Sequence, residues 1–392
     1  MPDAVLALNA GSSSIKFALF EVHGAGQVSA LLRGHLDGIG TAPHFLARDA
    51  AGATLDDMDL GEGAGDYEAL LRWMLSWIEG HQGPGRLAAV GHRVVHGGRD
   101  FTVPVLLTPA IVRALDALTP LAPLHQPHSL SPIRALAAVR PNLAQVACFD
   151  TAFHCTMPAV ATRFALPRQY EAEGVRRYGF HGLSYEHVAR TLRDTAPGLA
   201  AGRVVAAHLG NGASLCAMQD GASVDTTMGF TALDGLVMGT RCGSLDAGVV
   251  LYMLRQGTDA DTIERVLYQQ SGLLGVSGVS SDMRVLTGSA DPRAREAVEL
   301  FAYRVARETG ALAVSLGGLD GFVFTAGIGE HAAEVRAMVC ERLRWLGIVL
   351  DPPANARGAG RISAASSQVE VLVIPADEEA AIARHTVACA GL

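Results

Sequence analysis

Two stretches of this chain follow the same pattern. Residues 4–20 and 203–217 each consist of an apolar run, a short turn of Gly, Ser or Asn, and a second apolar run. This pattern is typical of a β-hairpin. A turn of glycine and serine lets backbone N–H groups and hydroxyls point at an anion, because little side chain stands in the way. Two such hairpins about half a chain apart predict a duplicated domain, with a phosphate-binding turn on each side of a cleft.

Length and composition limit the class of protein. The chain has 392 residues, enough for two domains, and 49% of them are hydrophobic, which argues against disorder. A net charge of −8 disfavours nucleic-acid binding. The six cysteines form neither a CxxC pair nor a zinc spacing, so we expect no disulfide framework and no structural metal. No apolar run reaches the roughly 18 residues that span a bilayer, and no signal-peptide pattern opens the chain. We therefore expect a soluble cytoplasmic protein.

Strand-like and helix-like segments alternate along the chain, which favours α/β architecture. We place a domain boundary just after Asp150. Residues 1–150, with a closing helix at about 380–392, then form an N-terminal domain, and residues 151–379 form a C-terminal one. The predicted helices cover residues 64–79, 294–316 (ended by Gly317-Gly318) and 377–389, and the predicted strands cover 88–95, 145–149, 321–326 and 369–375.

Several charged residues stand in unusual places. Arg93 lies inside an apolar strand and Arg241 in a glycine-flanked loop, so each is either held in an ion pair or faces a ligand anion. Asp150 follows a strand, which suits either a site of an α/β protein or a helix cap. His181 is either a structural histidine or a catalyst. Glu378 either reaches a cleft or only charges the first turn of a helix.

Three turns are candidates for binding phosphate. The turn over residues 9–16 and the turn over residues 208–214 are either ordinary polar hairpins or anion sites. Gly327-Ile328-Gly329 lies between a strand and a helix, and it is either a tight loop or a nucleotide site. It is not a GxGxxG, so the dinucleotide fingerprint is absent from this segment.

Together these segments resemble the acetate kinase family of short-chain acyl kinases, within the hexokinase–actin superfamily. The resemblance spans nearly the whole chain, and the motifs keep their order. The motifs are residues 8–17, 92–98, 123–125, 149–154, 178–182, 208–214, 223–226, 240–241 and 324–330.

The resemblance implies a fold and an activity. The fold would be two duplicated actin/hexokinase-like (ribonuclease H-like) α/β domains, each a mixed sheet flanked by helices, with an interdomain active-site cleft. The activity would be reversible in-line transfer of the γ-phosphoryl group of ATP to acetate, giving acetyl phosphate and ADP. It implies Mg²⁺, with Mn²⁺ as a substitute, and a homodimer that binds neither nucleic acid nor membrane. Residues 151–379 would bind the nucleotide.

The resemblance also implies roles for single residues. Asn9 and Glu378 would hold the metal, Arg93 would bind the acyl substrate, and His181 and Arg241 would stabilise the transition state. Asp150 would be the active-site acid. The methyl pocket would consist of Val95, Leu124, Phe180 and Ala232. The ATP site would comprise Ser12, Ser14, Lys16, His208, Leu209, Gly210, Asn211, Gly212, Asp282, Met283, Arg284 and a loop of Gly327, Ile328, Gly329, Glu330 and His331.

We interpret Asp150 differently from a general base. A carboxylate substrate, with a pKa near the value of about 4.3 for a Glu side chain, is already ionised at pH 7. The reaction therefore needs no base, and we expect Asp150 to orient Mg²⁺-bound water or an arginine.

The chain departs from the common family pattern at six positions. Asp234 replaces Glu and Leu183 replaces Thr. Ala232 replaces Pro, which predicts a wider methyl pocket and better use of propionate. His331 and Asp377 each replace Asn, and Tyr185 replaces His. Two alternatives to an acetate kinase stay open at this point: a propionate or butyrate kinase, and a non-catalytic ATP-dependent switch protein of the same superfamily.

Overall fold

The computed structural model describes residues 2–11, 14–61, 67–81, 83, 85–123, 125–358 and 360–392. The chain forms two compact units, Met1–Ala152 with Asp377–Leu392 (unit 1) and Phe153–Ala376 (unit 2). We propose that these units are its two domains.

Unit 1 is built on an eight-stranded mixed sheet in the order β5-β4-β3-β2-β1-β6-β8-β7. The first predicted hairpin is confirmed, because β1 and β2 pair antiparallel with Asn9 opposite Lys16. The strands are β1 (Asp3–Ala10), β2 (Ser14–His23), β3 (Gln27–Asp37), β4 (His44–Asp49), β5 (Thr54–Asp59), β6 (Arg86–Val94), β7 (Val105–Leu106) and β8 (Ala144–Phe149), and the helices are α1 (Tyr67–His81), α2 (Pro109–Asp116), α3 (Gln126–Val139) and α16 (Glu378–Ala390).

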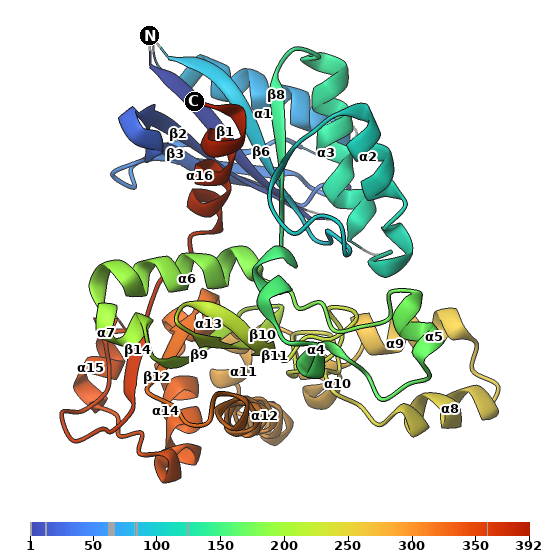
Figure 1. Ribbon diagram of the computed structural model, residues 1–392, viewed down its shortest axis with the longest axis vertical. Coiled ribbons are helices and arrows are strands. Elements are labelled where there is room, and N and C mark those ends of the chain that lie inside the picture. Colours follow the sequence, from blue (N-terminus) through green and yellow to red (C-terminus); the bar gives the residue numbers. More distant parts are fainter. Residues whose placement is uncertain are drawn as a thin grey trace. The chain divides into compact units, whose positions relative to one another are not determined.

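Helices cover both faces of this sheet (Figure 1). α1 and α3 pack on one face, where Leu6, Leu8 and Val90 join the largest apolar core of the unit. α16 packs on the other face against β1 and β6. Gly91 makes this approach possible, since a Cβ there would lie 2.0 Å from Oγ1 of Thr386 on α16.

Unit 2 contains a six-stranded sheet in the order β11-β10-β9-β12-β14-β13. The second predicted hairpin is confirmed, because β9 and β10 pair antiparallel from Ala213↔Leu209 onward. The strands are β9 (Arg203–Leu209), β10 (Ala213–Gln219), β11 (Ala222–Thr226), β12 (Gly321–Thr325), β13 (Gly360–Arg361) and β14 (Glu370–Val373). The helices are α4 (Ala159–Thr162), α5 (Arg168–Ala172), α6 (Gly182–Thr195), α7 (Pro197–Ala200), α8 (Ala247–Arg255), α9 (Ala260–Gln269), α10 (Gly272–Ser277), α11 (Met283–Thr287), α12 (Pro292–Leu316), α13 (Ala326–His331), α14 (Ala333–Arg342) and α15 (Pro352–Arg357).

The two sheets share one topology, which confirms the predicted duplication. In unit 1 the order β3-β2-β1-β6-β8 has two antiparallel pairings followed by two parallel ones. In unit 2 the order β11-β10-β9-β12-β14 repeats these directions strand for strand. Within unit 2, α6 covers one face of the sheet, and α12 and α14 lie beyond the other (Figure 1). The predicted fold class, two mixed sheets flanked by helices, is confirmed.

One expected loop is a helix. Residues 327–331 were predicted as a nucleotide-binding loop, yet they belong to the helix α13, Ala326–His331. The chain enters this helix from an extended Thr325 through Ala326, which has a positive φ of 64°. Contacts from elsewhere in unit 2 compensate for the low helix propensity of its two glycines, since buried Arg336 donates to the carbonyl oxygens of Gly329 and Glu330.

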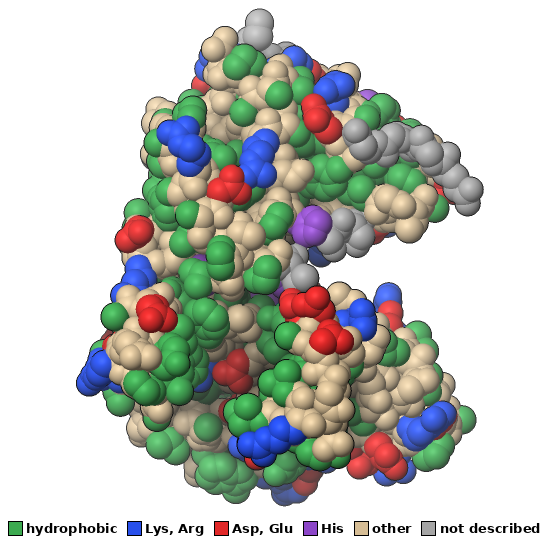
Figure 2. Space-filling view, turned by 90° about the vertical axis from the view of Figure 1, so that its right-hand side faces the viewer, with side chains coloured by type: hydrophobic (Ala, Val, Ile, Leu, Met, Phe, Trp, Pro, Cys, Tyr) green, Lys and Arg blue, Asp and Glu red, His purple; other side chains and the backbone are tan. Residues whose placement is uncertain are grey.

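The surface agrees with a weak net charge. Lys and Arg side chains are interspersed with Asp and Glu over the face drawn in Figure 2. Among the described residues, none of the helices combines the length and the apolar character that crossing a membrane requires.

Candidate active site

Unit 1 brings four of the predicted site residues together at one edge of its sheet. Asn9, Arg93 and Asp150 lie at or just beyond the carboxyl ends of the parallel strands β1, β6 and β8. Nε of Arg93 donates to Oδ1 and Oδ2 of Asp150 at 2.9 and 3.0 Å, and its Nη1 donates to Oδ1 of Asn9 at 3.1 Å. Glu378 comes to the same edge from the start of α16, where Oε2 accepts from Nδ2 of Asn9 at 3.1 Å. The carboxyl edge of parallel strands is the usual site position in α/β proteins.

Charge and burial at this edge are strongly linked. Asp150 is 1% exposed, so its negative charge depends on the guanidinium beside it. Burial raises the pKa of Glu378 to about 7, although the positive charge of Arg93 opposes this shift. Burial would lower the pKa of Arg93, but the carboxylates of Asp150 and Glu378 outweigh it and raise that pKa. Because burial is the main cause of the raised pKa of Glu378, additional positive charge beside this carboxyl would favour its ionised form.

Lys16 belongs electrostatically to this group. It is exposed on β2 opposite Asn9, and its charge lowers the pKa of Glu378. The sequence placed Lys16 with the ATP-binding residues, most of which lie in unit 2.

The donor atoms at this edge fit a hard cation. Carboxylate and amide oxygens with water are the ligands that Mg²⁺ prefers, and one or two carboxylates suffice because phosphate oxygens complete its shell. Glu378 and Asn9 offer such oxygens. A cation there would stabilise the ionised form of the buried Glu378 carboxyl. Within the described ranges, the structure has no cluster of three or more His, Cys, Asp or Glu side chains that would hold a metal on its own.

Unit 2 brings together two further predicted residues, His181 and Arg241. His181 precedes α6 with a left-handed φ of 58°, and its Nδ1 is 2.8 Å from Oγ of Ser214. A Cβ added at Gly212 would lie 3.3 Å from Nε2 of His181 and 3.8 Å from Nη2 of Arg241. Both side chains therefore border the glycine turn between β9 and β10. Arg241 is held by donating from Nη1 to the carbonyl oxygen of Ala232 at 2.9 Å.

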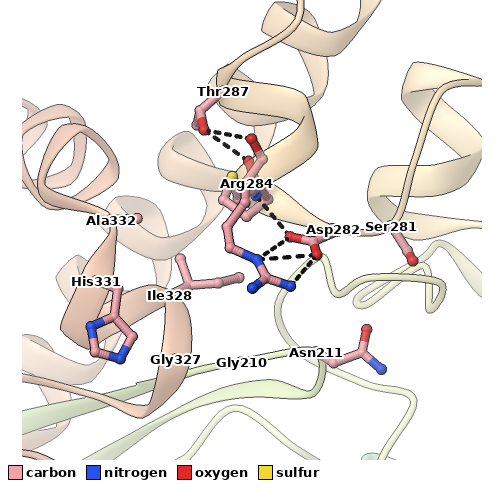
Figure 3. A pocket seen from close by; sticks show the side chains of 11 residues that line it. Gly210, Asn211, Ser281, Asp282, Arg284, Thr287, Gly327, Ile328, His331 and Ala332 are labelled. Carbon is pink, nitrogen blue, oxygen red and sulfur yellow. Dashed lines mark hydrogen bonds and ion pairs between the residues drawn. The ribbon is translucent and has the colours of Figure 1, made fainter.

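A cavity of about 580 Å³ lies beside this turn (Figure 3). It combines most of the predicted ATP-binding segments: the β9–β10 turn, the start of α11 and the helix α13. Asp282 caps α11 through the backbone N–H of Arg284 and also pairs with the Arg284 side chain, whose guanidinium extends over the cavity. The lining residues are Gly210, Asn211, Ser281, Asp282, Met283, Arg284, Thr287, Gly327, Ile328, His331 and Ala332.

Five predicted ATP-site residues of unit 2 are not among those that line the cavity. Leu209 is buried in the strand β9, and His208 stacks on His181 with ring centroids 4.2 Å apart. Gly212 borders His181 and Arg241 instead. Gly329 and Glu330 belong to α13, and Oε1 of Glu330 accepts from the backbone N–H of Ala376 at 2.9 Å.

The predicted methyl-pocket residues are divided between the units. Val95 in unit 1 and Phe180 in unit 2 are buried, and Ala232 in unit 2 is half-buried. Ser14 begins β2. Leu124 and Ser12 lie outside the described residues.

Sequence reasoning missed three residues that line the cavity. Ser281 precedes Asp282, Thr287 ends α11 one turn after Met283, and Ala332 follows His331. Their adjacency to predicted positions and the 3.6-residue helical period were signals that could have found them.

Comparison with known proteins identifies the family. Residues 4–384 match the sequence model of the Acetokinase family. The chain belongs to the acetokinase family. The predicted resemblance is thereby confirmed, and with it the prediction of an enzyme that transfers a phosphoryl group.

Relatives match over the full length. The chain is 57% identical over 390 residues to the acetate kinase of Rhodopseudomonas palustris (strain TIE-1), and the match covers 98% of each chain. It is 49% identical over 392 residues to the acetate kinase of Rhizobium meliloti, again covering 98% of each. Among solved structures, a propionate kinase from Francisella tularensis matches with a TM-score of 0.90 at 35% identity, over 98% of this chain and 99% of that one. The acetate kinase of Porphyromonas gingivalis matches with a TM-score of 0.87 at 35% identity, over 99% of each chain.

Proposed function

We propose that this member of the acetokinase family transfers the γ-phosphoryl group of ATP reversibly to acetate, forming acetyl phosphate and ADP. The observation that carries this proposal is the full-length match to acetate kinases, at 57% identity over 98% of the chain. Arg93, the proposed substrate-binding residue, belongs to unit 1, and the cavity proposed for the nucleotide belongs to unit 2.

Arg93 would bind the carboxylate of acetate. Its Nε and Nη2 already donate to the two carboxylate oxygens of Asp150, and a planar fork of N–H donors suits a second carboxylate equally well. Asp150 supports this role by fixing the guanidinium plane. Because acetate is already ionised at neutral pH, Asp150 has no proton to remove.

His181 and Arg241 would stabilise the transferred group. Phosphoryl transfer has a loose transition state with negative charge on the equatorial oxygens, and positioned N–H donors stabilise that charge. Both side chains border Gly212, where backbone can approach a phosphate closely. The adjoining cavity of about 580 Å³ is large enough for a nucleotide.

Asn9 and Glu378 would hold Mg²⁺, directly or through water. The ion would supply positive charge to the phosphate oxygens of ATP.

A propionate kinase is the second candidate. Ala232 offers a smaller side chain than the Pro of the common family pattern, and the propionate kinase of Francisella tularensis matches with a TM-score of 0.90. We propose that the chain also accepts propionate, with acetate preferred.

We further propose a cytoplasmic homodimer. None of the residues of α8 is buried, and Leu251 and Tyr252 are 52% and 62% exposed. An exposed apolar helix is typical of an interaction surface. Light scattering on wild type and on Leu251→Asp tests this, and a wild-type monomer contradicts it.

The activity test traps the product. The protein is incubated with ATP, Mg²⁺ and acetate, propionate or butyrate, and hydroxylamine converts any acyl phosphate to a coloured hydroxamate. We expect the highest yield with acetate, and a loss of at least about a hundredfold in Arg93→Ala. Arg86→Ala, which removes an exposed arginine at the start of the same strand, is the matched control. Absence of hydroxamate with all three acids contradicts the proposal.

A further inference from the structure

His181 is held by a hydrogen-bonded chain that continues into the core of unit 2. Its Nδ1 is 2.8 Å from Oγ of Ser214 on β10, and that oxygen is 2.5 Å from the hydroxyl of Tyr185 on α6. Both supporting side chains are completely buried. The proposed phosphoryl site uses His181 but assigns no role to the two hydroxyls behind it.

We propose that Tyr185 and Ser214 are positioning residues that keep neutral His181 in the tautomer with its proton on Nε2. This inference rests on the proposed phosphoryl transfer, because it explains how His181 would offer an N–H to the transferred group.

The direction of the hydrogen bonds follows from the chemistry of each group. Burial raises the pKa of Tyr185 well above its usual range, so its hydroxyl keeps its proton. The Tyr185 hydroxyl is paired with Oγ of Ser214, and a phenol is more acidic than an alcohol and therefore the stronger donor, so the Tyr185 proton is directed to Ser214. A serine hydroxyl has one proton and two lone pairs. Once Ser214 accepts from Tyr185, its own proton is available for Nδ1 of His181, which leaves the ring proton on Nε2.

In this tautomer the N–H of His181 is on Nε2, the ring nitrogen that lies beside the glycine turn. It lies 3.3 Å from the place that a Cβ at Gly212 would occupy, on the side of the turn that Arg241 also borders. The ring plane is fixed further by His208, which stacks on it with centroids 4.2 Å apart and planes 14° apart. His181 also has a left-handed backbone, which is uncommon for a residue other than glycine and often marks a functional site.

Tyr185 distinguishes this chain from the pattern with His at this position. A phenol that keeps its proton always has an O–H to donate in this chain of bonds, whereas an imidazole can exchange its donor and acceptor nitrogens. Ser214→Ala and Tyr185→Phe each remove one hydroxyl and leave the rest of the side chain in place.

The first test is spectroscopic and independent of activity. Protein labelled with ¹⁵N at histidine reports ring tautomers through its two nitrogen shifts, and His181→Asn assigns the signal. At pH 8 we expect His181 in the wild type as the Nε2–H form, and Ser214→Ala to shift it toward a mixture. The control is Ser223→Ala, which removes a buried hydroxyl 2.9 Å from Nδ1 of a different histidine, His154. An Nδ1–H form in the wild type, or a His181 signal that Ser214→Ala leaves unchanged, overturns the inference.

The second test is kinetic. We expect Ser214→Ala and Tyr185→Phe to lower kcat at least about tenfold, with the KM for acetate and for ATP within about twofold, because the bond would act in the transition state. In a His181→Asn background the same changes should cost nothing more. Additive losses would indicate a general structural role and overturn the inference. A wild type that forms no acyl phosphate contradicts the proposed function, while the tautomer measurement still decides this inference.

Discussion

Arg93 and Asp150 extend from the ends of two neighbouring parallel strands and meet in a forked contact, with Nε of Arg93 2.9 Å from Oδ1 and Nη2 2.5 Å from Oδ2 of Asp150. The arginine side chain is 21% exposed and the aspartate 1%. The carboxylate is therefore directed at a guanidinium, and the guanidinium keeps an accessible edge for a ligand.

This contact predicts the effect of Asp150→Asn. An amide offers one acceptor oxygen and places an NH₂ group against the N–H donors of the arginine. The orientation of the guanidinium is then no longer fixed, and the KM for acetate should rise at least about tenfold. Measurable turnover should remain, because acetate needs no base. Steady-state kinetics from pH 6 to 9 measure both. Asp116→Asn, at an exposed ion pair with Arg134, is the control. Near-complete loss of kcat with an unchanged KM and unchanged Mg²⁺ affinity would identify Asp150 as a base.

Glu378 predicts how the enzyme depends on its metal. A chelator should abolish acyl phosphate formation, and added Mg²⁺ should restore it. Glu378→Gln removes the charge but keeps an oxygen, so the Mg²⁺ concentration for half-maximal rate should rise about ten- to a hundredfold. The neighbouring Glu379→Gln is the control. Equal Mg²⁺ requirements in Glu378→Gln and wild type would show that the ion is held elsewhere.

Ala232 predicts the choice between acids. Ala232→Pro keeps the carbonyl oxygen that accepts from Arg241 but fills space beside it. One methylene in an apolar pocket is worth about 1–3 kcal/mol, so the ratio of kcat/KM for propionate to that for acetate should fall roughly fivefold or more. Initial rates with both acids measure this ratio. If it stays constant, position 232 does not line the pocket.

Three buried histidines predict how the stability of the fold falls at acid pH. Burial lowers the pKa values of His92, His96 and His154 from 6.5 to about 4. Between pH 6.5 and 4 these histidines are protonated in the unfolded chain but not in the folded one. Their contribution to the free energy of unfolding is therefore fully present above pH 6.5 and is lost as the pH falls toward 4. Each ring contributes at most about 3 kcal/mol.

Thermal unfolding midpoints between pH 7.5 and 4.5 measure this loss. His92→Gln should flatten the curve, and exchange of the exposed His128 should leave it unchanged. A midpoint that stays constant down to pH 4.5 would contradict the assignment.

The sequence was a good guide where local pattern decides structure. Both hairpins and the long helix α12, which ends at Gly317 with a left-handed φ of 69°, follow from apolar period and turn chemistry. The helix α13 did not follow, because its glycines favour a loop and its support comes from Arg336, a residue on another helix.

Arg336 is the clearest example of a residue whose position could not be predicted from the sequence. It is 1% exposed, and it holds α13 and α15 through the carbonyl oxygens of Gly329, Glu330 and Asn355. An arginine in a helical pattern normally indicates a solvent-facing position, and nothing local marks this one as buried. The grouping of Lys16 with Glu378 was hidden for the same reason, since it depends on where the last helix packs.

That last helix also determines when unit 1 can finish folding. α16 supplies Glu378 and fills the face beside Gly91, yet it is synthesised after all of unit 2. A chain translated only through unit 2 therefore has a first sheet that lacks both this helix and Glu378. A nonsense codon between residues 152 and 378 would leave the protein in that state, without the cover that α16 gives the sheet and without the proposed metal ligand.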